Sequence, residues 1–468
     1  MRIPLPLLAS CLLSLSLSLS LLGAQAGETV NDVTGLNPIE VAQVLAPTRL
    51  EEIVQAVREH PGPISIGGGR YSMGGQTATQ GALQLDMRRF DRVLQFCPQR
   101  REVRVQAGIT WRALLEFLDP HGLSPQIMQS YANFTVGGSL SVNVHGRYVG
   151  QGPMVLSVRS IRLVMADGRV LDASPTHNAE LFYGAIGGYG GLGVIVEATL
   201  ALDDNSKIAR QTEVMPLSDY RGYFFAQVRD NPQVLLHNGV LYPGAYDKVR
   251  AVSHRQTEQP LTIEERLVPL GRDYKTQRLG VKLVAGSAAG RTLRETTLDP
   301  LVYRSEQVQW RNHEASLDVA ELQPLAGADY SFALQEYFVP PAQLEAFVAQ
   351  MGGILNRHQA NVLNVSIRHA RPDPGTLLAW APEEVFALVI YYRQGTGSAE
   401  REAVAEWTRE LIDAALAHQG RYYLPYQIHA SRAQFLAAYP RADAFFALKK
   451  REDPTHKFRN KLWDAYYP

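Results

Sequence analysis

The sequence predicts an α+β fold divided into two large units. The chain has 468 residues, which is more than one ordinary hydrophobic core accommodates. Short strands do not alternate one for one with helices, which argues against a doubly wound parallel sheet. Three glycine-rich segments lie before residue 205 and none follows. We therefore expect a first unit that ends near residue 205 and a second, differently built unit after it.

The first helix is expected over residues 48–60, where apolar residues recur at helical spacing. Thr48 is placed to cap its start, with Glu51 three residues later as the capping-box partner. The segment Pro61-Gly62-Pro63 ends the helix. The apolar run 64–66 then follows as a strand.

The rest of the first unit is rich in strands. Residues 83–86 and 103–108 alternate apolar and polar side chains, as strands do. Thr110 is expected to cap a helix over residues 111–118. Residues 160–171 predict a hairpin, because an Asp-Gly pair divides two strand-like runs.

The second unit alternates strands and amphipathic helices. Its expected strands cover residues 331–339, 361–369 and 385–392, and its expected helices cover residues 343–355 and 401–417. This order predicts one antiparallel sheet with helices on one face.

The three glycine-rich segments carry the functional signal. They are residues 64–75, 135–146 and 186–196. Glycine leaves backbone N–H groups open to a ligand, and several such groups suit a pyrophosphate. No Lys-Ser or Lys-Thr follows the first loop, so it is not a Walker loop. The third segment precedes its strand, whereas a Rossmann glycine turn follows one, so a Rossmann site is excluded.

In this order and spacing, the three segments resemble the vanillyl-alcohol oxidase/para-cresol methylhydroxylase (PCMH) family of flavoproteins. The resemblance implies FAD, bound in an extended shape between two small α+β lobes of a PCMH-type domain at residues 38–205. It further implies a substrate (cap) domain with an antiparallel sheet at residues 206–430. Residues 431–468 are similar to the end of sugar-lactone and alditol oxidases, which implies a segment that returns to the FAD domain.

The resemblance also assigns cofactor contacts. The residues that it places against FAD are Gly67, Gly68, Gly69, Arg70, Tyr71, Ser72, Gly137, Gly138, Ser141, His145, Gly190, Gly193 and Ile195. Many family members carry a histidine joined to the flavin where this chain has Tyr71. We therefore expect non-covalent FAD. Cys97 lies outside any linkage motif, and an inert thiol is the alternative reading.

Three residues are candidates for catalysis. Arg368 matches an arginine that faces substrate and flavin in alditol oxidases, but Ser366 stands where their glutamate would be. His145 ends the second segment and can take up a proton near neutral pH. Tyr426 replaces the lysine of a lactone-oxidase motif and can hydrogen-bond a sugar. Strand alternation places either Glu336 or its neighbour on the inner face of the cap.

Composition excludes several classes of function. Lys+Arg and Asp+Glu both number 46, and no charged tail is present, so nucleic acid is not an expected partner. The twelve histidines are scattered and HExxH is absent, so no metal site is expected.

Residues 1–26 predict a secretory signal peptide, with Ala24-Gln25-Ala26 before the cleavage point. An uncleaved membrane anchor is the alternative, and only then would a membrane be a partner. Cleavage would remove Cys11 and leave Cys97 without a disulfide partner. We expect a periplasmic or secreted protein. The signal has no twin arginine, which predicts export of the unfolded chain and FAD binding afterwards.

The resemblance predicts an FAD-dependent oxidase or dehydrogenase acting on CH–OH groups. Its substrate would be a sugar, a polyol or a sugar-derived lactone, with a lipid-linked sugar, as in decaprenylphosphoryl-ribose oxidases, as one possibility. Electrons would pass to oxygen or another acceptor. The alternatives are a flavin- or ligand-binding protein with reduced catalysis and a cytokinin- or amine-type flavin oxidase.

Overall fold

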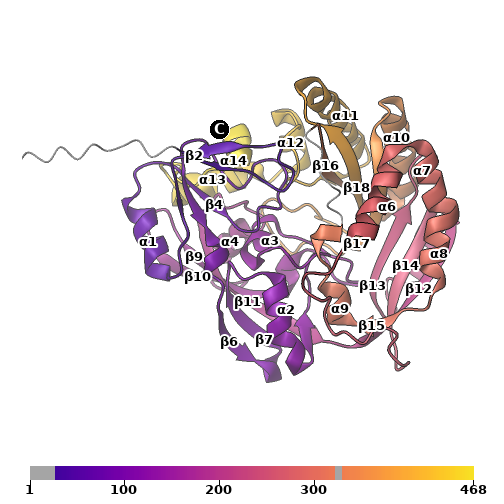
Figure 1. The fold of residues 1–468 in the computed structure, drawn as a ribbon. Coiled ribbons are helices and arrows are strands. Elements are labelled where there is room, and N and C mark those ends of the chain that lie inside the picture. The colour runs from indigo at the N-terminus through magenta and orange to yellow at the C-terminus, as the bar shows by residue number, and fades with distance from the viewer. Residues whose placement is uncertain (1–26, 322–328) are drawn as a thin grey trace, which may run out of the picture.

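The computed structural model describes residues 27–321 and 329–468. Figure 1 shows a first half in indigo to magenta beside a second half built around one large sheet. The yellow C-terminal helices lie on the first half. The expected α+β architecture of two units with antiparallel sheets is confirmed. The expected signal peptide, residues 1–26, lies outside the described residues.

The first half contains two lobes. The smaller lobe has a parallel sheet in the order β3-β5-β4, a two-stranded sheet β1-β2 and helix α1. Its elements are β1 (Glu28–Val30), β2 (Ile39–Val41), β3 (Gln43–Leu45), α1 (Leu50–Glu59), β4 (Ile64–Gly67) and β5 (Leu83–Asp86). Buried side chains of α1 and the three parallel strands form a core cluster beneath the helix.

The larger lobe is an antiparallel sheet in the order β10-β9-β11-β7-β6, with β8 paired further along β11. Its strands are β6 (Val93–Cys97), β7 (Glu102–Gln106), β8 (Leu123–Pro125), β9 (Val158–Val164), β10 (Val170–Ala173) and β11 (Val194–Asp204). Its helices are α2 (Trp111–Leu118), α3 (Val136–Val142) and α4 (Ala179–Ala185). The expected hairpin is confirmed by the β9–β10 pairing.

The helix caps were predicted with mixed success. Thr110 caps α2, because its hydroxyl accepts a hydrogen bond from the N–H of Ala113 at 3.1 Å. At α1 the expectation was wrong, because the helix begins at Leu50 and its cap position is residue 49. The third helical residue is therefore Glu52 rather than Glu51. The Glu52 carboxylate accepts from the N–H of Thr48 at 2.8 Å.

The second half is an eight-stranded antiparallel sheet in the order β15-β12-β14-β13-β17-β18-β16-β19. Its strands are β12 (Lys207–Pro216), β13 (Val234–Leu241), β14 (Lys248–Gln256), β15 (Val308–Trp310), β16 (Tyr330–Val339), β17 (Asn361–Ala370), β18 (Val385–Gly395) and β19 (Arg421–Tyr422). The three expected strands are therefore present as β16, β17 and β18.

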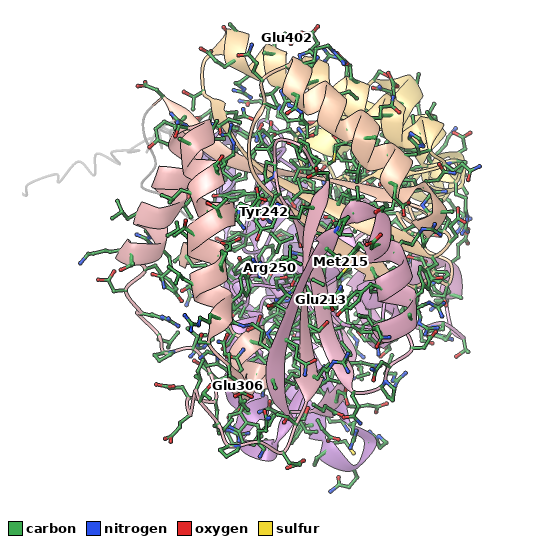
Figure 2. The ribbon with its side chains drawn as sticks, turned by 90° about the vertical axis from the view of Figure 1, so that its right-hand side faces the viewer. Glu213, Met215, Tyr242, Arg250, Glu306 and Glu402 are labelled. Carbon is green, nitrogen blue, oxygen red and sulfur yellow. The ribbon has the colours of Figure 1, made fainter. Side chains whose placement is uncertain are left out.

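The helices of the second half cover both faces of this sheet, not one face as expected. The outer face packs against α5 (Leu217–Gln227), α10 (Leu344–Arg357) and α11 (Ser398–Ala417), through ring contacts such as Tyr392 with Trp407. Part of the inner face is covered by α6 (Lys275–Gly286), α7 (Ala288–Leu293) and α8 (Asp299–Arg304). In Figure 2, Tyr242 and Arg250 lie on the side of these three helices and Met215 on the side of α5. The short helix α9 (Arg311–Ala315) follows β15.

The C-terminal segment returns to the first half. It forms α12 (Arg432–Ala438), α13 (Ala442–Glu452) and α14 (Lys461–Tyr466). Phe458, between α13 and α14, pairs with Ile64 of β4 as a parallel bridge. This pairing brings the end of the chain beside the first glycine-rich loop. Within the residues that the structure describes, no helix has both the length and the hydropathy needed to span a membrane.

Candidate active site

One large cavity lies between the loops of the first half and the inner face of the second. Its volume is about 680 Å³, and all three glycine-rich segments contribute to its wall. Every residue expected to contact FAD lines it except Gly67. Gly67 is buried at the end of β4, where a Cβ atom would lie 2.4 Å from Nε2 of Gln84. This glycine therefore serves the packing of the loop rather than the cavity wall.

The first loop leaves β4 with its backbone open to the cavity. The N–H groups of residues 69–72 have no acceptor within the part of the chain that the structure describes. A Cβ atom on Gly68 would lie only 2.2 Å from Oγ1 of Thr135, so the loop sits directly on the second segment. Arg70 adopts the left-handed conformation with φ of 62°, which a non-glycine residue rarely does without a functional reason.

The second segment folds into helix α3. The Thr135 hydroxyl caps it by accepting a hydrogen bond from the N–H of Gly138. A Cβ atom on Gly138 would meet only this hydroxyl, at 3.0 Å, so the glycine leaves space in the cavity. Gly137 instead lies against the backbone of Ala107. The two glycines therefore have different roles, one open and one packed.

The third segment passes the cavity in a strained conformation that the C-terminal segment supports. Tyr189 has φ of 51° and Gly190 has φ of 67°. The Tyr189 carbonyl accepts from Nδ2 of Asn460 at 2.7 Å and from Nε1 of Trp463 at 3.3 Å. The Gly191 carbonyl accepts from Nζ of Lys449 at 2.7 Å.

Lys449 is an internal cation. Its side chain is fully buried and pairs with the equally buried Asp453 at 2.8 Å. Burial lowers the pKa of the lysine, while the Asp453 carboxylate acts in the opposite direction. Lys450, its neighbour in the sequence, is exposed. Lys449 is therefore part of the packed interior, whereas Lys450 is a surface residue.

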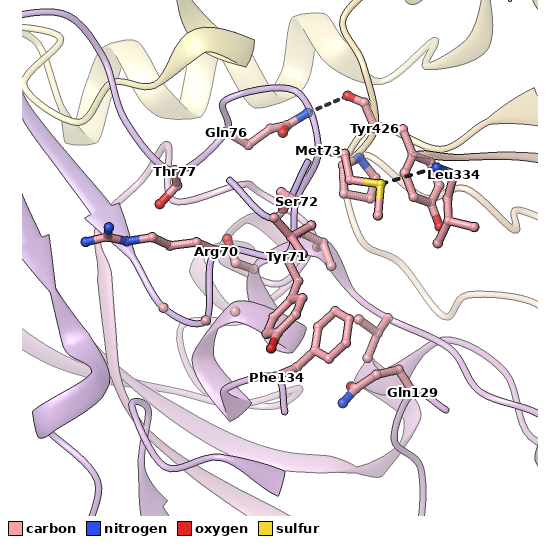
Figure 3. Close-up of a pocket in the computed structure, with 18 of the residues that line it drawn as sticks. Arg70, Tyr71, Ser72, Met73, Gln76, Thr77, Gln129, Phe134, Leu334 and Tyr426 are labelled. Carbon is pink, nitrogen blue, oxygen red and sulfur yellow. Dashed lines mark hydrogen bonds between the residues drawn. The ribbon is translucent and has the colours of Figure 1, made fainter. Parts of the chain in front are cut away.

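Tyr71 lies where the resemblance places a flavin-linked histidine in other members. Its ring stacks on that of Phe134, with centroids 4.3 Å apart (Figure 3). Among the described residues that line the cavity, His145 is the one histidine, and none is a cysteine. Cys97 lies at the end of β6, away from the cavity wall.

His145 and Glu336 form the polar end of the cavity. Nε2 of His145 lies 2.5 Å from Oε1 of Glu336, and both side chains are almost fully buried. The other carboxylate oxygen, Oε2, accepts from the Tyr426 hydroxyl at 3.1 Å. Burial raises the pKa of Tyr426, and the Glu336 carboxylate raises it further. The phenol therefore stays protonated and donates to the carboxylate.

Aromatic side chains enclose His145. The ring of Trp380 lies 4.8 Å from the imidazole, and those of Phe338 and Tyr423 lie 5.8 and 6.2 Å away. The Trp380 indole donates to the carbonyl of Asn143, and the Tyr423 hydroxyl donates to that of Val142. These contacts fix the imidazole and exclude water from its apolar side.

Arg368 projects from β17 into the same cavity. Its Nε has no hydrogen-bond partner among the described residues. Burial lowers the pKa of the guanidinium, while Glu336 acts in the opposite direction. Arginine remains charged in proteins, so an unsatisfied cationic donor faces the cavity. Such a group favours an anionic or hydroxyl ligand.

Position 366 of β17 carries a serine where the resemblance leads one to expect a glutamate, and Glu336 of β16 supplies a carboxylate to the site instead. Ser366 pairs with Val389, and Val389 pairs with Glu336, so the three side chains share one row across the inner face. Glu336 therefore reaches the site from two strands away. The three expected catalytic residues, Arg368, His145 and Tyr426, lie together around it. Alternation along β16 indicated that Glu336 or its neighbour faces inward, but only the register of the sheet identifies the row.

The cavity wall fits FAD. Its unpaired backbone donors lie on one loop, which suits a diphosphate. The buried Oγ1 of Thr77 and Nε of Arg70 lie in the same wall and also lack partners among the described residues (Figure 3). No three His, Cys, Asp or Glu side chains in the described ranges gather to hold a metal ion.

Comparisons with known proteins agree with this assignment. Residues 40–174 match the model of a family described as "FAD binding domain". The chain is 31% identical to cytokinin dehydrogenase 4 of Oryza sativa subsp. japonica over 40% of its length, and the match spans 36% of that protein. It is 28% identical to alditol oxidase of a Streptomyces species, over 77% of this chain and 80% of that one. It is 23% identical to decaprenylphosphoryl-β-D-ribose oxidase of Mycolicibacterium smegmatis, over 90% and 94%.

The family match covers the first and second glycine-rich segments, and two of these relatives align with most of the chain. The unpaired donors of the cavity wall suit the same cofactor. The chain is therefore a flavoprotein with an FAD-binding domain of the PCMH type, and FAD is its cofactor.

Proposed function

We propose that the chain is an exported FAD-dependent oxidoreductase that oxidises a hydroxyl carbon of a sugar, a polyol or a sugar-derived lactone. One observation carries the proposal. An arginine with an unpartnered donor and a buried histidine–carboxylate pair face the cavity whose opposite wall is made by the glycine-rich loops. Cationic and hydrogen-bonding groups that converge on one cavity suit a substrate rich in hydroxyl groups. Alditol oxidase is among the relatives that align with most of the chain.

The protein's own residues would orient and polarise the substrate. When bound, FAD supplies the acceptor for the hydride that leaves the substrate carbon. Arg368 would bind the reacting oxygen and stabilise negative charge as it develops there. His145 would hold the polar end in place, because Trp380 and Tyr423 restrict its ring. Burial of these groups strengthens each of the charge interactions.

The proposal includes non-covalent FAD and export. Tyr71 offers no nucleophilic ring nitrogen to the flavin, and its ring is stacked on Phe134. The leucine-rich start of the chain and its small-residue cleavage pattern support a periplasmic or secreted location. The electron acceptor would be oxygen or a second redox partner.

The relatives suggest two further candidates for the substrate. A lipid-linked sugar is one, because a decaprenylphosphoryl-ribose oxidase aligns with most of the chain. A cytokinin-type amine is the second candidate, because a cytokinin dehydrogenase aligns across 90% of the chain. The charged side chains of Glu336 and Arg368, which line the same cavity, favour hydroxyl groups over the apolar side chain of a cytokinin. The third alternative is a flavin-binding protein with reduced catalysis, since position 366 carries a serine, but Glu336 in the same row of the sheet argues against it.

Anaerobic mixing of the purified flavoprotein tests the function. Bleaching of the flavin absorbance by xylitol, sorbitol or L-gulono-1,4-lactone supports it. Bleaching by N6-isopentenyladenine alone favours the amine alternative, and no bleaching by any compound favours the binding protein. Arg368→Lys should slow bleaching, because lysine lacks the planar fork of donors. The control is Arg255→Lys on β14, whose Nε also lacks a partner among the described residues but lies outside the cavity.

A further inference from the structure

The carboxyl group of Glu336 is buried at the polar end of the cavity. Its side chain is 2% exposed, and each carboxylate oxygen has its own hydrogen-bond partner. His145 lies against Oε1 and Tyr426 donates to Oε2. These two contacts fix the position and orientation of the carboxyl group. A carboxyl group held at a fixed position beside a phenol hydroxyl can receive a proton along that hydrogen bond.

Tyr426 lines the same cavity as this carboxylate. Its hydroxyl hydrogen is directed to Glu336, which leaves the oxygen lone pairs available to accept a hydrogen bond. The guanidinium of Arg368 interacts electrostatically with both groups. A substrate hydroxyl bound at Arg368 is therefore placed next to the tyrosine oxygen.

Several titratable groups surround the carboxylate. They come from the loop after α3, from β17, from the third glycine-rich segment, from the stretch that follows β19 and from the C-terminal segment. They are His145, Arg368, Tyr189, Tyr423, Tyr426 and Tyr439. The tyrosines all have raised pKa values, because they are buried, and they remain neutral. Arg368 and His145 are then the cationic or ionisable partners of Glu336.

We infer that Glu336 is the final acceptor of the substrate hydroxyl proton and that Tyr426 relays this proton to it. The inference rests on the proposed function. The substrate O–H bond breaks as its proton binds the Tyr426 oxygen, and the tyrosine's own proton passes to Oε2 of Glu336. Bound FAD would accept the electron pair of the adjacent C–H bond as hydride, which would leave the substrate carbon as a carbonyl. Proton and hydride together account for the two hydrogens lost.

His145 is a positioning residue in this scheme. Its ring touches Oε1, on the side of the carboxylate away from Tyr426, so it orients the acceptor and does not receive the proton directly. The chain offers a matched pair outside the cavity for comparison. Nε2 of His369 lies 2.7 Å from Oε1 of Glu384, in a second His–Glu contact, in which the histidine is buried and the glutamate is partly exposed.

The test compares three variants of the flavin-loaded protein: Glu336→Gln, Tyr426→Phe and the control Glu384→Gln. Anaerobic flavin reduction by the reacting polyol is followed over a range of pH. Loss of general base catalysis should slow reduction in the first two variants by a factor of at least about 100. The KM for the polyol should change little, because Arg368 still binds the hydroxyl. The flavin of Glu384→Gln should be reduced at the same rate as that of the unchanged protein.

Two further readouts separate the relay from a structural role. The unchanged protein should lose activity toward acid pH, and Glu336→Gln should lose that acid limb, because glutamine cannot be protonated there. A downfield proton NMR resonance from the His145–Glu336 hydrogen bond should be present in the resting protein and in Tyr426→Phe, and absent in Glu336→Gln. This resonance is independent of turnover.

Distinct outcomes overturn the relay and the proposed function. If the unchanged protein is reduced by a polyol but Glu336→Gln is reduced equally fast, the function stands and the relay is wrong. If Glu336→Gln keeps the acid limb, a group other than Glu336 accepts the proton. If no hydroxyl compound reduces the unchanged protein, the proposed function fails and the relay fails with it.

Discussion

Removal of the buried cation Lys449 should destabilise the whole flavin-binding half. Nζ donates to the Gly191 carbonyl at 2.7 Å, to the Asp453 carboxylate at 2.8 Å and to the Phe458 carbonyl at 2.9 Å. Lys449→Met keeps the length and apolar volume of the side chain but leaves all three acceptors buried without this donor. Breaking a buried ion pair on one side costs about 3 to 5 kcal/mol. At roughly 2 °C per kcal/mol for a large domain, the thermal midpoint should fall by about 6 to 10 °C.

The assay is thermal unfolding followed both by circular dichroism and by release of flavin fluorescence. Lys450→Met is the matched control, because its lysine is the exposed neighbour in the same helix. Combining Lys449→Met with Asp453→Asn should restore part of the stability, because the stranded charge is then removed as well. Since Lys449 holds the third flavin loop, flavin release should precede loss of secondary structure in Lys449→Met.

Two results would refute this reasoning. A midpoint for Lys449→Met that coincides with that of Lys450→Met would show that the three hydrogen bonds contribute nothing net. A double variant as unstable as the sum of the two single variants would show that lysine and aspartate act independently.

The remaining predictions concern the loops, the flavin linkage and acid stability. Gly68→Ala should abolish flavin binding, because its Cβ would lie 2.2 Å from Oγ1 of Thr135. The control Gly222→Ala, with no atom within 4 Å of the new Cβ, should bind flavin fully. Flavin absorbance per protein measures both variants, and full flavin content in Gly68→Ala would contradict the assignment of the loop. Acid precipitation should leave FAD in the supernatant, because Tyr71 offers no linkage, and a yellow pellet would disprove this. Burial raises the pKa of Glu314, but Arg147, His254 and Gln309 together outweigh burial and bring it to about 2, below its ordinary value of 4.5. As the pH falls, the unfolded chain therefore binds this proton at a higher pH than the folded protein does. The ionised Glu314 contributes about 3 kcal/mol to the free energy of unfolding. This contribution is complete above pH 4.5 and disappears as the pH falls toward 2. The thermal midpoints of Glu314→Gln and the unchanged protein should converge over that window, and a constant difference would argue against the shift.

Backbone features were the most predictable part of the site from sequence. The glycine loops at residues 64–75 and 186–196 were recognisable, because glycine is the residue that permits close backbone approach and positive φ. The strands β16, β17 and β18 followed from their alternation. These signals are local, so one sequence is enough to read them.

The features that depend on register were less accessible. Ser366 suggested that the site lacks an acid, and yet Glu336 supplies one in the same row of the sheet. Pairing between β16 and β18 decides this, and no local pattern encodes it. The position of helices α6 to α8 on the inner face was missed for the same reason, because the face that a helix covers depends on chain connections over long distances.

The C-terminal donors also bear on the order of events during synthesis. The Gly191 carbonyl and its lysine partner are 258 residues apart in the chain. The Tyr189 carbonyl and Asn460 are 271 residues apart. A ribosome therefore completes the nucleotide-facing loop long before the side chains that secure it emerge. Stable coenzyme binding therefore requires the last few dozen residues, and a nascent chain released early would have an incomplete pocket that binds the coenzyme weakly.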